Sequence, residues 1–176
     1  MSTNAGQTQQ RQAPKIDMNA SLSTVGTDIP EGTYPGTFSG FGEAKYLPSS
    51  FKPDQPQLRM PAEVVIRLKD GSCEQVDGLV GPPDGGRVNR KSNLGKLLKV
   101  LANGDAKLWD KDKDALAAGV KLSDFVGRPV MVAIKLGGSN KDFPTIGGYM
   151  SPVDGLKYPT ADEVKASAGS SEGIPF

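Results

Sequence analysis

The chain has 176 residues, of which 36% are hydrophobic and 23% are charged, and its formal net charge is +1. These values predict one folded domain with a modest core and exclude a globally basic nucleic-acid binder. Because the chain has no histidine and one cysteine, Cys73, an intramolecular disulfide, a cysteine-based zinc site and Ser-His or Cys-His catalysis are excluded. We therefore expect a non-enzymatic protein that needs no cofactor or metal.

The two ends of the chain differ in composition from its middle. No apolar run approaches the roughly 20 residues of a membrane span, and the polar N-terminus does not resemble a signal peptide, so we expect a cytoplasmic protein. Residues 1–28 lack aromatics and hydrophobic periodicity, which predicts a disordered N-terminal tail. Residues 29–159 form the predicted domain, and residues 160–176, rich in Ser, Ala and Gly, form a predicted flexible C-terminal tail.

Three strands are predicted in the first half of the domain. The first runs from Thr33 to about Lys45, and a proline-punctuated loop follows it. The second runs from Leu58 to Leu68 with regular apolar and polar alternation, and Pro61 within it indicates an edge or a bulge. Asp70-Gly71 then predicts a type I′ hairpin turn into a third strand that ends at Val80.

The clearest predicted helix lies between Arg87 and Gly104. Its leucines recur at positions i, i+3, i+4 and i+7, which makes one apolar stripe. Ser92 is the predicted N-cap, and Asn103-Gly104 is the predicted stop. The remaining elements are expected to be a short helix over 114–118, a single turn over 123–127, and strands over 129–136 and about 145–150.

The order of these elements is three strands, a helix and two strands. This order predicts a mainly β protein, a five-stranded OB-fold barrel with one helix between strands three and four. An SH3-like barrel and an open α+β sheet are the alternatives.

Three segments carry a family resemblance: PEGTY, SNLGKLLKVL and LSDFVGRPVMVAI. Together they resemble small phage-encoded OB-fold proteins. The last residues, Ile174, Pro175 and Phe176, resemble the C-terminal tip of bacterial single-stranded DNA-binding proteins, although Glu172 is the only acid in the last seven residues. The resemblance implies that the protein coats single-stranded DNA in replication, recombination or repair, in the bacterial host cytoplasm, and that the tip binds partner proteins. It leaves open whether the protein is an oligomer.

Single-strand binders combine a cationic groove with aromatic rings on which bases stack. In an OB-fold, the loops after strands one and four and the hairpin of strands two and three line that groove. The candidate nucleic-acid-binding residues in those places, with the basic approach to the helix, are Lys45, Tyr46, Phe51, Lys52, Arg59, Arg67, Lys69, Arg87, Arg90, Lys91, Lys141 and Phe143. Alternatively, the aromatics tuck under their loops, and the arginines lie on an ordinary solvated face. Because Glu63 is the only acid expected on that face, the sequence favours binding there over a merely solvated face.

A second hypothesis is that the chain is a small β-barrel subunit of a phage virion or another assembly. This predicts a large exposed apolar patch and oligomerisation without DNA. An enzyme is the weakest alternative, because only carboxylate or lysine chemistry remains.

Overall fold

The structure, a computed structural model, describes residues 29–49, 51–137 and 143–169. The predicted N-terminal tail and the C-terminal tip lie outside these ranges. The described part is mainly β. Its elements, in chain order, are β1 (Gly32–Phe41), β2 (Lys45–Leu47), β3 (Gln57–Arg67), β4 (Cys73–Val80), α1 (Asn93–Ala102), β5 (Trp109–Asp110), β6 (Ala115–Leu116), the 3-10 helix η1 (Leu122–Phe125), β7 (Pro129–Gly137), β8 (Phe143–Met150) and α2 (Ala161–Gly169).

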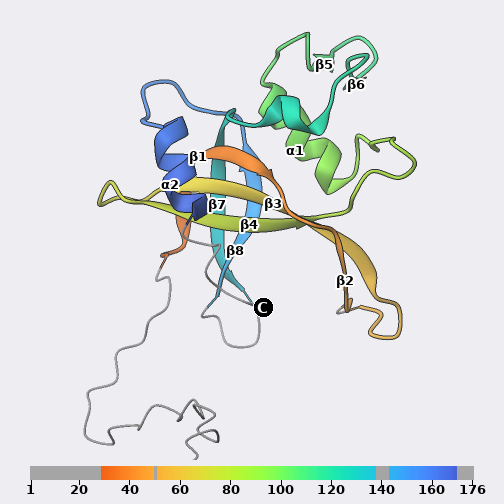
Figure 1. Ribbon diagram of the computed structural model, residues 1–176, viewed down its shortest axis with the longest axis horizontal. Coiled ribbons are helices and arrows are strands. Elements are labelled where there is room, and N and C mark those ends of the chain that lie inside the picture. The colour runs from red at the N-terminus through yellow and green to blue at the C-terminus, as the bar shows by residue number, and fades with distance from the viewer. Residues whose placement is uncertain (1–28, 50, 138–142, 170–176) are drawn as a thin grey trace, which may run out of the picture.

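Six strands form one antiparallel sheet (Figure 1). Strand β1 lies between β3 and β7, β8 pairs with β7, and both β2 and β4 pair with β3. Within the described residues no ladder joins β4 to β8, so the sheet is open. The mainly β prediction is confirmed, whereas the closed five-stranded barrel is not seen.

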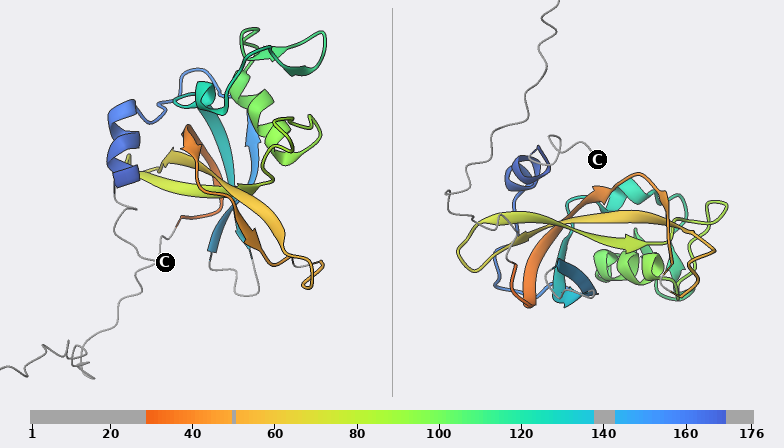
Figure 2. Two further views of the ribbon diagram at one scale, coloured as in Figure 1. Left: turned by 45° about the vertical axis from the view of Figure 1, so that its right-hand side comes forward. Right: turned by 90° about the horizontal axis from the view of Figure 1, so that it is seen from below.

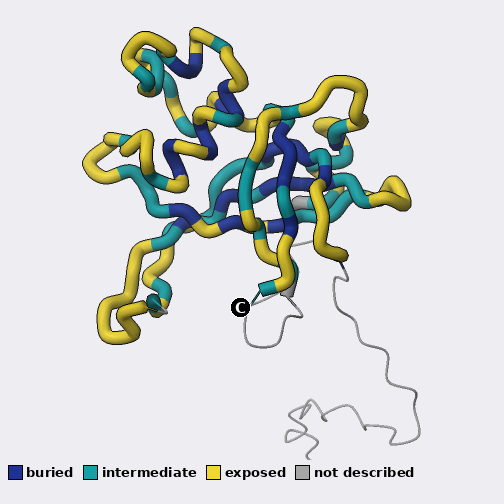
Figure 3. The backbone as a smooth tube through the Cα atoms, turned by 180° about the vertical axis from the view of Figure 1, so that it is seen from behind, coloured by how far each residue is buried: buried dark blue, intermediate teal, exposed yellow. Residues whose placement is uncertain are grey.

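One face of the sheet and the leucine stripe of α1 form the core. The buried segments of the backbone gather in the middle of the described domain (Figure 3). The alternating side chains of β3 are buried as predicted, from Met60 to Ile66, and every leucine of the α1 stripe is at most 1% exposed. Ser92 caps α1 by accepting a hydrogen bond from the backbone N–H of Gly95 (3.0 Å), and Asn103 ends the helix in the left-handed conformation. The predicted helix, its cap and its stop are therefore confirmed.

Helix α2 covers the opposite face of the sheet (Figure 2). It begins with a capping box, because Glu163 accepts from the backbone N–H of Thr160 (2.8 Å) while Thr160 Oγ1 accepts from the N–H of Glu163 (3.3 Å). Thr37 Oγ1 donates to the carbonyl of Pro159 (2.7 Å), which fixes the start of α2 on β1. Helix α2 therefore lies within the segment that the sequence predicts to be a flexible tail.

Three local predictions differ from the structure. Strand one breaks after Phe41 and resumes as β2. Gly71 has φ +90° but Asp70 has no positive φ, so the turn is not type I′. The predicted helix over 114–118 is wrong, because Asp114 has φ +47° and the next two residues pair with β5. A tertiary contact favours this arrangement: buried Trp109 donates from Nε1 to Asp114 Oδ1 (3.2 Å).

The seam between β4 and β8 is filled by a side chain instead of a ladder. The ring of Tyr149 on β8 lies over Gly78 on β4, and a Cβ built on Gly78 would lie 2.2 Å from Tyr149 Oη. A glycine at this position is therefore what allows Tyr149 to occupy the seam.

Replacing Gly78 tests this packing. We expect Gly78→Ala to lower the free energy of unfolding by about 1–3 kcal/mol, because the added methyl group overlaps the Tyr149 hydroxyl. Adding Tyr149→Phe removes the overlapping oxygen, so the double variant should regain at least about 0.5 kcal/mol. Urea unfolding of the single and double variants measures this coupling. Gly148→Ala is the matched control, because its Cβ meets no atom within 4 Å; additive effects of the two changes would contradict the packing.

Candidate nucleic-acid interface

A two-stranded arm projects from the sheet (Figure 1). It consists of β2, the first three residues of β3 and the loop between them. Strand β4 ends at Val80, opposite Met60, so Gln57–Arg59 of β3 pair with β2 alone. The arm exists because β3 is longer than the strand on its other edge.

The arm exposes two of the predicted aromatic side chains. Phe51 is 94% exposed and Tyr46 is 71% exposed, so neither tucks under its loop. Their positions differ, because the register pairs Lys45 with Arg59 and Tyr46 with Leu58. Since side chains alternate along a strand, Tyr46 lies on the opposite face of the arm from Lys45 and Arg59.

A concavity of about 450 Å³ brings together three predicted residues: Phe51, Lys52 and Arg59. Leu79 of β4 also lines it and is 52% exposed, a residue that the sequence reasoning missed. The guanidinium of Arg59 donates to the Gln57 side chain. An exposed ring beside two cations is an arrangement that can stack a base and bind the adjoining phosphates.

The sheet beyond the arm is not a continuous cationic face. Glu63 of β3 lies opposite Asp77 of β4, between Arg59 and Arg67, so Glu63 is not the only acid on this face. Burial, with a smaller contribution from the charge of Asp77, raises the pKa of Glu63. Carboxylates at this position would repel a phosphate backbone.

Arg67 is engaged in holding α2. Its guanidinium lies 2.5 Å from Glu163 Oε2 and donates to the backbone carbonyls of Gly71 (3.0 Å) and Lys157 (3.2 Å). The hydrogen bond from Arg67 holds the pKa of the Glu163 carboxyl below its usual value, with a further contribution from the Thr160 N–H. Lys69 lies exposed in the turn at the far end of this hairpin. The structure therefore separates Arg67 and Lys69 from the arm.

The basic residues before α1 form another group. Gly85 and Gly86 have φ of +55° and +75°, and they connect Asp84 to Arg87 in a tight turn. Arg90 lies 3.6 Å from Asp114, and Lys91 is exposed. None of these side chains lines the arm concavity.

The other predicted residues are not placed by the structure. Lys141, Ile174, Pro175 and Phe176 lie outside the described residues, and Phe143 begins β8 with its side chain undescribed.

Two kinds of feature are absent from the described residues. Among them, no cluster of His, Cys, Asp or Glu has the geometry to bind a metal ion. No helix in those ranges is both long and apolar enough to cross a membrane.

Comparison with known proteins gives no relative. No protein family, no curated protein and no solved structure matches this chain.

The Arg67–Glu163 pair predicts how pH affects α2. Because the pKa of Glu163 is lowered in the folded state, its contribution is complete above its unfolded pKa of about 4.3 and is lost as the pH falls through the lowered value. We expect faster hydrogen exchange of the α2 amides below pH 4, after correction for the intrinsic pH dependence.

At pH 7, Glu163→Gln should increase the same exchange several-fold. The matched control is Asp162→Asn, the neighbouring acid of the first turn. Equal exchange in both variants would show that the pair does not hold α2.

Proposed function

We propose that this protein binds single-stranded DNA with little sequence preference, as a coat in phage or bacterial replication, recombination or repair. The observation that carries the proposal is the arm, where Phe51 is 94% exposed beside Lys52 and Arg59. A large aromatic side chain gains nothing from this position in the free protein. A base stacked on it would remove the exposed ring from water, and the two cations would neutralise phosphates.

We also propose that the sheet is an OB-type arrangement. The pairing of β1 with both β3 and β7, and the position of α1 between β4 and β7 in the chain, support this proposal. The OB-fold is a partly open barrel, and β4 and β8 are the strands that would meet at its opening. In this arrangement the arm extends the loop between the first two barrel strands, a place where OB-folds bind nucleic acid.

The proposed protein acts without catalysis, cofactor or membrane, in the cytoplasm. Its partners are single-stranded DNA and, through the Ile-Pro-Phe tip, replication or recombination proteins.

Alanine substitution on the arm tests DNA binding. We expect Phe51→Ala to weaken binding of a labelled oligo-dT by about 5- to 150-fold, which corresponds to about 1–3 kcal/mol per stacked base. Tyr46→Ala should weaken it less, because Tyr46 lies on the opposite face of the arm from Arg59. Fluorescence anisotropy measures the affinity. Lys52→Ala and Arg59→Ala should each lower the slope of log affinity against log salt by about 0.7, because each removes about one phosphate contact.

Val153→Ala is the control for these variants, since Val153 is 54% exposed and lies outside the arm. Wild-type protein that binds no oligo-dT at low salt would refute the proposed function. Binding that is unchanged in all four arm variants would show that the DNA lies elsewhere.

The tip is tested by truncation. Deleting Ile174 to Phe176 should abolish co-purification with proteins that bind the tips of bacterial single-stranded DNA-binding proteins, and it should leave oligo-dT affinity intact or higher. Ser171→Ala is the matched control in the same segment. Equal recruitment by the truncated chain would remove the role of the tip.

One observation also favours an assembly subunit. Leu58 and Leu79, 38% and 52% exposed, add apolar area to the aromatics of the arm. Sedimentation without DNA separates the two functions, because an assembly subunit oligomerises through exposed apolar side chains such as these without DNA, whereas a DNA-binding arm needs the single strand.

A further inference from the structure

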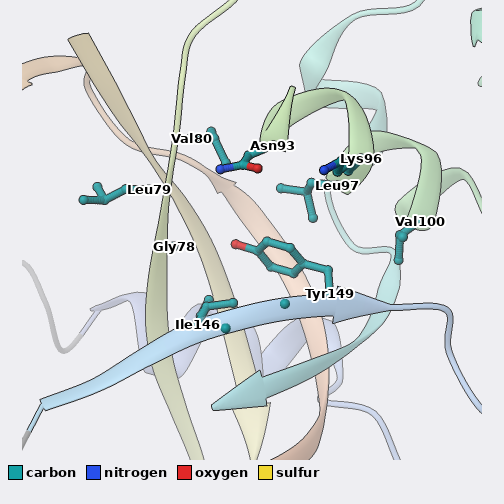
Figure 4. A pocket seen from close by; sticks show the side chains of 11 residues that line it. Gly78, Leu79, Val80, Asn93, Lys96, Leu97, Val100, Ile146 and Tyr149 are labelled. Atoms are coloured by element: carbon teal, nitrogen blue, oxygen red, sulfur yellow. The ribbon is translucent and has the colours of Figure 1, made fainter. Parts of the chain in front are cut away.

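A second concavity lies beside the seam between β4 and β8, where the Tyr149 side chain packs and no ladder forms (Figure 4). This cleft of about 320 Å³ is bounded by β4, α1 and β8, and its apolar wall consists of Val80, Leu97, Val100 and Ile146. Its volume is within the range of roughly 300–1,000 Å³ that is typical of small-ligand sites. The backbone of Gly147 and Gly148 forms part of the lining, so a planar group can approach the strand closely.

Tyr149 supplies the cleft with a polar group that has no partner. Its side chain points from β8 toward β4, and its Oη is buried without a hydrogen-bond partner among the described residues (Figure 4). Burial, with a smaller contribution from Asp77, raises the pKa of Tyr149 to about 12. The hydroxyl therefore stays protonated at neutral pH and is able to donate a hydrogen bond to a ligand.

The rim of the cleft is cationic. Lys96 lines it and is exposed, and it forms no ion pair within the described part of the chain. The first turn of α1, which opens onto the cleft at Asn93, contains no acid. An anionic ligand with a planar apolar part is therefore the chemistry that this cleft complements.

The cleft and the arm concavity share one residue. Leu79 lines both, so the two sites lie on either side of β4 at a single point. Arg59 and Phe51 line the arm concavity and Lys96 lines the cleft, so a single-stranded DNA that contacted all three side chains would pass by Leu79.

We propose that the seam cleft binds one nucleotide of the single strand held by the arm. The base enters the apolar part and accepts a hydrogen bond from Tyr149 Oη, and its phosphate contacts Lys96. This inference rests on the proposed function, because the arm supplies the strand. The binding residues then include Tyr149 and Lys96, and the bound DNA turns around the edge of β4.

Two substitutions test the cleft by different measurements. Tyr149→Phe keeps the ring and removes one hydrogen bond, so we expect oligo-dT affinity to fall about three- to tenfold. The melting temperature of the free protein should stay equal or rise, because the hydroxyl has no partner in it. A hydroxyl with a purely structural role would instead lower the melting temperature. Lys96→Ala should lower the salt slope by about 0.7, the value of one phosphate contact.

The control for Lys96 is Lys113→Ala, an exposed lysine on the β5–β6 hairpin outside the cleft. The wild-type titration is made first. Absence of any binding by the wild type means that the proposed function itself fails. Tight binding by the wild type that neither Tyr149→Phe nor Lys96→Ala changes would overturn the cleft alone and leave the arm standing. A salt slope that falls equally for Lys113→Ala would also overturn it, since that marks a general charge effect.

Discussion

The register of β3 is the constraint on which the rest of this structure depends. One edge of β3 is divided between β1, which pairs with Ala62–Ile66, and β2, which pairs with Gln57–Arg59. The other edge pairs only with β4. Pro61 lies between the part of β3 that pairs with β1 and the part that pairs with β2, and it belongs to neither ladder. Proline is tolerated there because no strand on that edge needs its missing N–H as a hydrogen-bond donor. The long strand β3 can therefore contain a proline, and its first three residues extend beyond the end of β4 as part of the arm.

The same strand is buried from both sides, which limits where a ligand can bind. Helix α1 lies over one face of the sheet and α2 over the other, so Val65 is as inaccessible as its neighbours Val64 and Ile66. Arg67 has direct hydrogen bonds to the α2 segment, and its charge is balanced by Glu163. Of the β3–β4 hairpin, the arm and the edge of β4 border open concavities, and both of these concavities are lined by Leu79.

The elements predictable from the sequence are those whose signals are local. Ser92 and the leucine stripe specify α1 within about ten residues, and the alternation in β3 is equally local. Helix α2 also has a local signal, the Thr160-x-x-Glu163 capping box, within a segment whose composition favours a flexible tail. Its docking depends on Arg67, which is 96 residues away from Glu163, and no local pattern encodes that contact.

The candidate site shows the same division. The exposed ring and cations of the arm follow from a proline-rich loop between two strands, which is visible in the sequence. The seam is not visible there, because it requires that Gly78 and Tyr149 face each other across strands that do not pair. The short helix expected after Trp109 fails for a related reason: the indole is buried, and its hydrogen bond to Asp114 fixes a backbone conformation that helices do not use.

Two features of the free protein are unfavourable for its own stability, and a single ligand would relieve both. A buried hydroxyl without a partner costs about 1–3 kcal/mol, and phenylalanine would fill the same space as Tyr149 without that cost. The ring of Phe51 lies in water, where a polar residue would serve a loop equally well. Departures from what folding alone favours are expected where a chain binds something. The proposed single-stranded DNA would provide a base for the ring, a hydrogen-bond acceptor for the hydroxyl, and phosphates for Lys52 and Lys96. One ligand would then account for both departures.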